Sequence, residues 1–286
     1  MLERTVNRVR AAVRPATIGG ALQRGLAATD RSRGVYPALG ELAARWRESS
    51  PAPGLTAHEL RVFSQNGEDG VLAEIFRRIG VRGGGFAEFG ASDGVEGNAA
   101  FPAQVLGWPG ALFEADEGAF GSLERRYRGT DRVRTVHAAV EPDTVEALFA
   151  AAAVQEEPDL LSIDVDGNDY WIWRALERFR PRVVVVEYNG DLDPREPLVQ
   201  PYTPGRRWDH SSGYGASLAA LEALATEKGY RLVHTELAGV NAFFVREEEA
   251  GPLPSGDEVP RRSASHTLSG HGHPPPRRAP DWQSPS

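Results

Sequence analysis

The sequence of 286 residues has no cysteine, a single methionine and a single lysine, Lys228. The absence of cysteine excludes disulfides, thiol nucleophiles and thiolate metal ligands, and it fits a reducing compartment. No apolar run reaches the roughly 18 residues that a membrane-spanning helix needs, and the N-terminus lacks the apolar core of a signal peptide. We therefore expect a cytoplasmic protein. The net charge of −8 argues against general nucleic-acid binding.

Basic charge is concentrated near the N-terminus. Residues 1–33 contain seven arginines and only two acidic residues. Within this segment Leu2, Val6, Val9 and Val13 recur at helical spacing, which predicts a short basic amphipathic helix. The segment either contacts a membrane surface or a partner protein, or it lies as a weakly ordered arm on its own acidic domain. Together with the linker at 49–54, it makes residues 1–54 an N-terminal arm and linker.

The C-terminal segment is rich in Pro, Ser, Arg and His and has few large apolar residues. Such a composition buries too little apolar surface to offset the entropy lost on ordering. We therefore expect residues 249–286 to form a disordered tail whose removal costs little stability.

Between these segments, residues 55–248 alternate between strand-like and helix-like patterns, which predicts an α/β domain. The expected strands are 85–89, 111–114, 133–139, 160–165, 183–188, 230–236 and 241–245, and the expected helices are 68–79, one containing 123–127, 143–153, 170–179 and 217–229. The four valines at 183–186 are typical of a strand buried on both faces of a parallel sheet. The last two strands are joined by a connection too short for a helical crossover, so they pair antiparallel. We predict a mostly parallel, seven-stranded sheet that ends in an antiparallel hairpin.

Acidic residues mark the first two expected strands. Glu88 lies in the first strand, which runs into a turn containing Gly90 and Gly94, and Glu114 ends the second strand. In α/β folds, ligands bind at the carboxyl ends of the strands. Gly90 and Gly94 let the backbone approach a ligand where a Cβ atom would collide. The carboxylate of Glu114 would accept hydrogen bonds from two neighbouring ribose hydroxyls.

These segments resemble motif I and the ribose-binding acid of class I S-adenosylmethionine (SAM) methyltransferases. The Gly-Ala-x-x-Gly form of the turn is similar to that of FkbM-like methyltransferases, although Ser92 stands where many class I enzymes have a middle glycine. The turn lacks the G-x-G-x-x-G pattern of NAD-binding domains. The resemblance implies the Rossmann-like class I methyltransferase fold and SAM as the cofactor.

The same resemblance implies a set of cofactor contacts: Gln65, Glu88, Gly90, Gly94, Glu114 and Ala138. Glu88 would orient the glycine turn and the methionine part of SAM, and Ala138, with Ala139, would contact the adenine edge. Gln65 belongs to the polar segment 64–69, which is similar to a segment that closes over the cofactor in FkbM-like proteins. The alternative for this segment is helix capping by Ser64 or Asn66.

A second acidic segment covers residues 162–170. Asp164 and Asp166 would face the same side of an extended strand, Asp169 would begin the next helix, and Glu187 ends the adjacent strand. Carboxylates this close repel one another unless a cation, a proton or substrate hydroxyls compensate. Oxygen ligands of this kind suit Mg²⁺, whereas the alternative is a helix cap and an Asp-Gly turn. We favour the metal-free alternative and assign no metal ligand.

Methyl transfer from a sulfonium to a hydroxyl requires removal of the hydroxyl proton. The candidate catalytic residues are Asp164, Asp166 and His210, the last in a polar, aromatic loop that follows the fifth strand. An exposed loop histidine is the alternative for His210. We expect SAM-dependent O-methylation of a hydroxylated small molecule or a glycan.

Two other functions compete with this one. The first is a non-catalytic scaffold of the same fold that docks through residues 1–33. The second is a metal-dependent hydrolase that uses the aspartates, and the acidic residue after the second strand argues against it.

Overall fold

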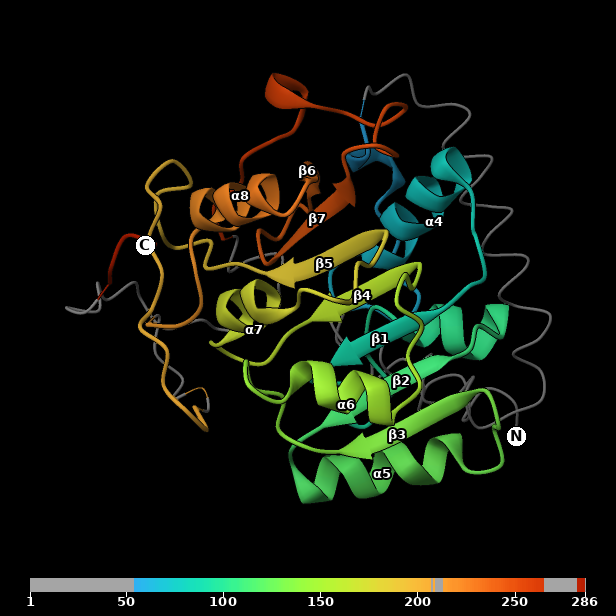
Figure 1. The fold of residues 1–286 in the computed structure, drawn as a ribbon. Helices are drawn as coiled ribbons and strands as arrows, with labels where there is room; N and C mark the ends of the chain where they lie inside the picture. Colours follow the sequence, from blue (N-terminus) through green and yellow to red (C-terminus); the bar gives the residue numbers. More distant parts are fainter. Residues whose placement is uncertain (1–53, 207, 209–212, 265–281, 286) are drawn as a thin grey trace, which may run out of the picture. The chain divides into compact units, whose positions relative to one another are not determined.

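A seven-stranded sheet forms the centre of the computed structural model, which describes residues 54–206, 208, 213–264 and 282–285. The strands are β1 (Phe86–Phe89), β2 (Gly110–Glu114), β3 (Val133–His137), β4 (Leu160–Ile163), β5 (Val183–Glu187), β6 (Tyr230–Thr235) and β7 (Asn241–Arg246). They lie in the order β3-β2-β1-β4-β5-β7-β6 (Figure 1). Strands β1 to β5 are parallel, and β7 is antiparallel to both β5 and β6. The predicted sheet and its terminal hairpin are confirmed.

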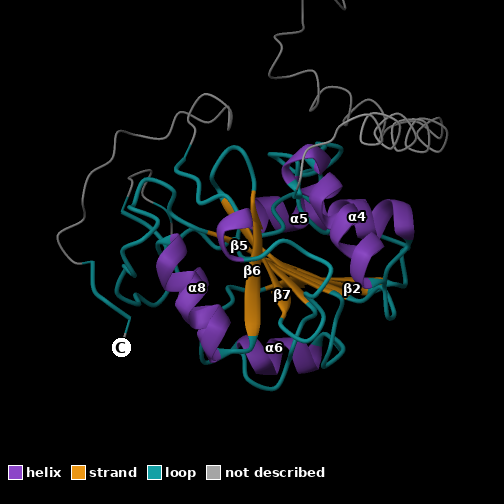
Figure 2. Ribbon diagram, turned by 90° about the horizontal axis from the view of Figure 1, so that it is seen from above, coloured by secondary structure: helices purple, strands orange, loops and turns teal. Residues whose placement is uncertain are grey.

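Helices cover both faces of the sheet, as Figure 2 shows from above. One face packs against α4 (Glu68–Ile79), α5 (Glu117–Tyr127) and the π-helical segment η3 (Pro102–Leu106). The other face packs against α6 (Val145–Ala151), α7 (Asp169–Ala175) and α8 (Leu218–Glu227). Alternate residues of β5 enter the two cores, Val183 and Val185 on the α4 side and Val184 and Val186 on the α7 side. Burial on both faces explains why the strand is a continuous apolar run.

Two helix ends differ from the sequence prediction, and at both ends a side-chain oxygen accepts hydrogen bonds from backbone N–H groups. The helix expected over 170–179 ends at Ala175, because Glu146 of α6 accepts the N–H groups of Glu177 and Arg178 at 2.8 and 2.6 Å. The N-cap residue of α4 is Gly67, although the hydroxyl of Ser64 still accepts the Asp69 N–H at 3.1 Å.

The expectation of a disordered tail from residue 249 is wrong for residues 249–264, and Gln283 also pairs with Val199 through two backbone hydrogen bonds. Ala250, Leu253 and Val259 are buried, and a short 3-10 helix, η4 (Gly256–Glu258), lies between them. The segment ends against the main domain, where Ala264 donates its N–H to the carbonyl of Gly190 at 2.9 Å. Three apolar side chains among many polar residues are too sparse to reveal this packing in the sequence.

No helix in the described part of the chain is long and apolar enough to cross a membrane. The predicted basic arm at residues 1–33 lies outside the described residues, as does the predicted linker at 49–54 except for Gly54. One further short 3-10 helix, η2 (Thr56–His58), precedes the polar segment before α4.

Candidate functional site

A cavity of about 570 Å³ opens at the carboxyl ends of β1, β2 and β4. Because the chain runs from β1 outward to β3 and then crosses to β4, this edge is the point where the strand order reverses, and it is where α/β folds bind ligands. Among the predicted site residues, those that line the cavity are Gln65, Gly90, Glu114, Ala138, Asp164 and Asp166. Five separate segments of sequence are therefore brought to one site.

Glu114 is held firmly in the cavity wall. Its Oε2 atom accepts the Ser92 N–H at 2.7 Å, and its Oε1 atom accepts the Asp116 N–H at 2.7 Å. The side chain is nearly buried. Each carboxylate oxygen has two lone pairs, so each can still accept a hydrogen bond from a ligand hydroxyl. This geometry fits the predicted role of Glu114.

The glycine turn after β1 passes very close to the end of β4. A Cβ atom on Gly90 would overlap the carbonyl oxygen of Asp164, and Gly90 has a φ of +70°. Ser92 also adopts a left-handed φ, +49°, as does Asp166 at +59°. Non-glycine residues in this region carry strain that is often found at functional sites. Ser92 thus adopts a left-handed backbone conformation that glycine adopts most readily.

Glu88 and Gly94 do not line the cavity, and their contacts are with the protein itself. The buried carboxylate of Glu88 accepts the Asn98 N–H at 2.7 Å, and burial raises the pKa of Glu88 to about 7. A Cβ atom on Gly94 would lie 2.6 Å from Cδ1 of Leu123. Glu88 holds the segment that follows the turn, and Gly94 lets the turn pack on α5, so neither predicted cofactor contact lines the cavity.

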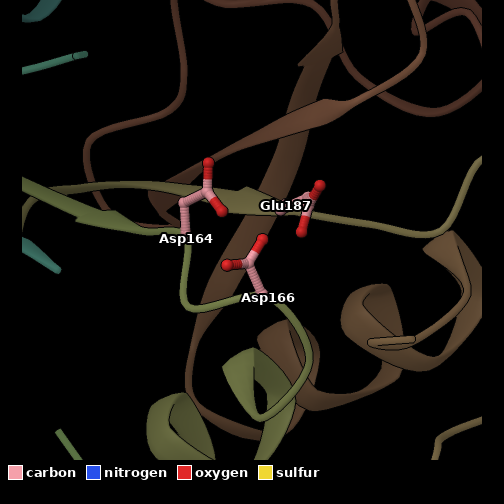
Figure 3. Close-up of side chains that lie close together, drawn as sticks. All are labelled: Asp164, Asp166 and Glu187. Carbon is pink, nitrogen blue, oxygen red and sulfur yellow. The ribbon is translucent and has the colours of Figure 1, made fainter. Parts of the chain in front are cut away.

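Three carboxylates converge at the ends of β4 and β5. One carboxylate oxygen from each of Asp164, Asp166 and Glu187 lies within 4.8 Å of the other two (Figure 3). The strand ends at Ile163, so Asp164 and Asp166 meet through the left-handed turn at Asp166 and not through the predicted alternation of an extended strand. Burial, and then repulsion by the neighbouring acids, raises the pKa values of Asp164 and Glu187 well above their usual range.

Asp169 has a structural role beside this cluster. Its two carboxylate oxygens accept the N–H groups of Val165 and Gly167 at 2.8 and 2.9 Å, which fixes the turn between β4 and α7. Burial raises its pKa to about 6. Of the alternative considered for the acidic segment, the turn at Asp166 and Gly167 is present, whereas the N-cap residue of α7, Asn168, makes no side-chain cap hydrogen bond.

In the polar segment before α4, some residues stabilise the loop and another lines the cavity. Asp69 accepts hydrogen bonds from the backbone N–H groups of Val62, Phe63 and Ser64, at 2.7 to 2.9 Å. Gln65 is exposed and lines the cavity. Ser64 and Asp69 hold the loop closed, and Gln65 remains available to a ligand.

Sequence reasoning missed several lining residues that come from loops far along the chain. Glu141 follows β3, and its carboxylate accepts the Gly205 N–H at 2.8 Å, while Arg206 donates to the carbonyl of Gly213 at 2.9 Å. Trp208 lines the same wall. These residues follow no strand-end pattern, although the aromatic composition of the loop around Trp208 was a signal. His210 lies outside the described residues.

Comparison with known proteins finds similarity in structure only. No family model and no curated sequence matches the chain. The N-terminal domain of EvdMO1 with SAH bound is 17% identical, with a TM-score of 0.42 over 72% of this chain and 94% of that chain. Magnesium protoporphyrin IX methyltransferase (ChlM) from Synechocystis PCC 6803 with bound SAH is 13% identical, with a TM-score of 0.43 over 75% and 98%. The mitomycin 7-O-methyltransferase MmcR is 15% identical, with a TM-score of 0.36 over 61% and 53%.

The strand order and the antiparallel β7 define the fold class without reference to these similarities. A mostly parallel seven-stranded sheet that ends in an antiparallel hairpin, with helices on both faces, is the Rossmann-like class I methyltransferase fold. The predicted fold class is thus confirmed.

Proposed function

We propose that this chain is a SAM-dependent methyltransferase of the FkbM-like kind and that it methylates a hydroxyl group of a small molecule or a glycan. The observation that carries the proposal is Glu114, a buried carboxylate fixed at the end of β2 beside the glycine turn of β1. An acid in this position suits the two hydroxyls of a ribose.

The cavity residues fit the parts of SAM. Glu114 would accept hydrogen bonds from the ribose, Ala138 and Ala139 would contact the adenine edge, and Gln65 would contact the cofactor from the opposite segment. Bound SAM would supply an electrophilic methyl group. At Gly90 the cavity is lined by backbone, which passes too close to the carbonyl of Asp164 to carry a side chain.

The carboxylate cluster would act on the acceptor. Asp164 and Asp166 line the cavity, and they would orient the acceptor hydroxyl and accept its proton, a role for which His210 is the other candidate. A raised pKa makes Asp164 a stronger base once it is ionised. The cluster would also repel anionic acceptors, which favours neutral hydroxylated ones.

Calorimetric titration with SAM tests the proposal directly. We expect the wild-type protein to bind SAM and Glu114→Ala to bind it more weakly by about 1.5–3 kcal/mol, roughly 10- to 150-fold in Kd, because charge-assisted hydrogen bonds are lost. Glu124→Ala is the matched control, since Glu124 is an exposed acid on α5. Equal SAM affinities of the two variants would show that Glu114 does not bind the ribose.

Failure of well-folded wild-type protein to bind SAM would contradict the proposal. The non-catalytic scaffold is then favoured, and it requires that removal of residues 1–33 abolish binding to a partner or a membrane.

A further inference from the structure

The loop that carries Gln65 is closed at its base by backbone hydrogen bonds. Leu60 donates its N–H to the carbonyl of Gly67 at 3.0 Å, and Gly70 donates to the carbonyl of Leu60 at 3.2 Å. Gln65 lies between these points, exposed and in the cavity wall. The position of Gln65 therefore depends on what fixes residues 59 and 60.

Glu59 fixes that base to the edge of the sheet. Its carboxylate, which is 8% exposed, accepts the Leu237 N–H at 3.1 Å and lies 3.0 Å from Nε2 of His234 on β6. It also accepts a hydrogen bond from Nη1 of Arg262 at 3.2 Å. Arg262 belongs to the C-terminal segment that composition predicts to be disordered.

Arg262 joins this base to two other elements. Its Nη1 donates to the carbonyl of Thr235 at 2.6 Å, and its Nη2 donates to the hydroxyl of Thr56 at 2.9 Å. Its own carbonyl accepts the hydroxyl of Tyr188 at 2.8 Å. Tyr188 directly follows Glu187, one of the three clustered carboxylates.

The same segment is held against the end of β5 on its other side. Ala264 donates its N–H to the carbonyl of Gly190 at 2.9 Å, and a Cβ atom on Gly190 would lie 2.6 Å from the Ala264 nitrogen. Residues 260–264 thus contact both the base of the Gln65 loop and the segment that follows the acidic cluster.

We infer that Arg262 is a positioning residue, and that residues 260–264 hold the Gln65 loop in register with the segment that follows β5 and the acidic cluster. The Gln65 loop is the cofactor side and the end of β5 is the acceptor side, an assignment that rests on the proposed function. The Arg262 side chain does not line the cavity and acts on the loop through Glu59, whereas its backbone carbonyl accepts the hydroxyl of Tyr188, the residue after β5.

Arg261 provides a matched control because it is the neighbouring arginine with a different partner. Its Nη2 donates to Glu222 on α8 at 2.7 Å, and it is exposed. We expect Arg262→Ala to raise the Kd for SAM roughly tenfold and Arg261→Ala to leave it unchanged, since displacement of a positioned group weakens binding. Arg262→Lys keeps one charged donor near Glu59, so its affinity should lie between those of the wild type and Arg262→Ala.

Two further measurements separate positioning from general stability. Hydrogen exchange without SAM should accelerate in residues 60–67 of Arg262→Ala while the exchange of β4 and β5 stays as in Arg261→Ala. In a double-mutant cycle, the effect of Arg262→Ala on Kd should largely disappear in a Gln65→Ala background. If Arg262→Ala does not fold, the SAM affinity, the hydrogen exchange and the double-mutant cycle are measured with Arg262→Lys instead.

The outcomes distinguish this inference from the proposed function. Wild-type protein that does not bind SAM overturns the proposed function, whereas the exchange of residues 60–67 still tests Arg262. Wild-type protein that binds SAM, with Arg262→Ala and Arg261→Ala alike in affinity and exchange, overturns the positioning role.

Discussion

Gly90 shows how strongly a single residue is constrained by its surroundings. A side chain at this position would strike the backbone of Asp164 before it could reach a ligand. We expect Gly90→Val to cost about 3 kcal/mol or more of unfolding free energy, because backbone cannot yield as a flexible side chain does. Urea denaturation measures the loss, and Gly121→Ala on α5 is the control, since its Cβ has no neighbour within 4 Å. A stable Gly90→Val protein that only loses SAM affinity would restore the simpler prediction of a blocked cofactor path.

Asp69 makes stability depend on pH. Burial raises its pKa from 3.8 to about 6, so between these values the folded protein holds a proton that the unfolded chain has released. Protonation of Asp69 therefore adds about 3 kcal/mol to the free energy of unfolding below about pH 4, and this contribution is lost as the pH rises through 6. Asp69→Asn lacks this titration. The wild type should therefore lose stability relative to Asp69→Asn between pH 4 and 7 in urea unfolding. Exposed Asp131→Asn is the control, and parallel curves for wild type and Asp69→Asn would contradict the prediction.

At the scale of elements, the C-terminal segment behaves as part of the domain. Deletion of residues 250–286 removes buried Leu253 and Val259 together with Arg262, so we expect a loss of at least about 3 kcal/mol of unfolding free energy. Deletion of residues 265–286 alone keeps these contacts and removes the two backbone hydrogen bonds between Gln283 and Val199, so it should cost less, about 1–2 kcal/mol. Thermal melting of both truncations checks the prediction. Equal melting temperatures would show that the packing of residues 250–264 contributes little.

The ends of β4 and β5 raise the question of a metal. We expect turnover to continue in excess chelator, because the raised pKa values of Asp164 and Glu187 allow protons to offset the repulsion within the cluster. Turnover of metal-free protein, verified by elemental analysis, is the measurement. Loss of turnover with unchanged SAM affinity, and its recovery with Mg²⁺, would instead assign a Lewis-acid role to a cation bound by this cluster.

At the scale of the whole molecule, a ligand that binds only the folded state must stabilise all of it. At a SAM concentration of about 100 times Kd the gain is about 2.7 kcal/mol, which corresponds to a rise in melting temperature of roughly 5–10 °C. ATP shares the adenosine but lacks the methionine part, so it should produce a smaller shift. An unchanged melting temperature in SAM, with folded protein, would favour the scaffold.

The sequence alone determined the sheet, because buried parallel strands leave continuous apolar runs, as at 183–186, and amphipathic helices leave a helical period, as at 68–79. These patterns depend on few distant contacts. It also predicted Gly90, Glu114, Asp164 and Asp166, since the carboxyl ends of parallel strands meet at one edge, whereas Gln65 and Ala138 were implied by the resemblance to FkbM-like methyltransferases. Only the tertiary structure decided that Glu88 faces the protein, and that Arg206 and Arg262 lie where they do. Their positions depend on loop paths and on hydrogen bonds between residues as distant in sequence as Thr56 and Arg262, and such contacts leave no local periodicity.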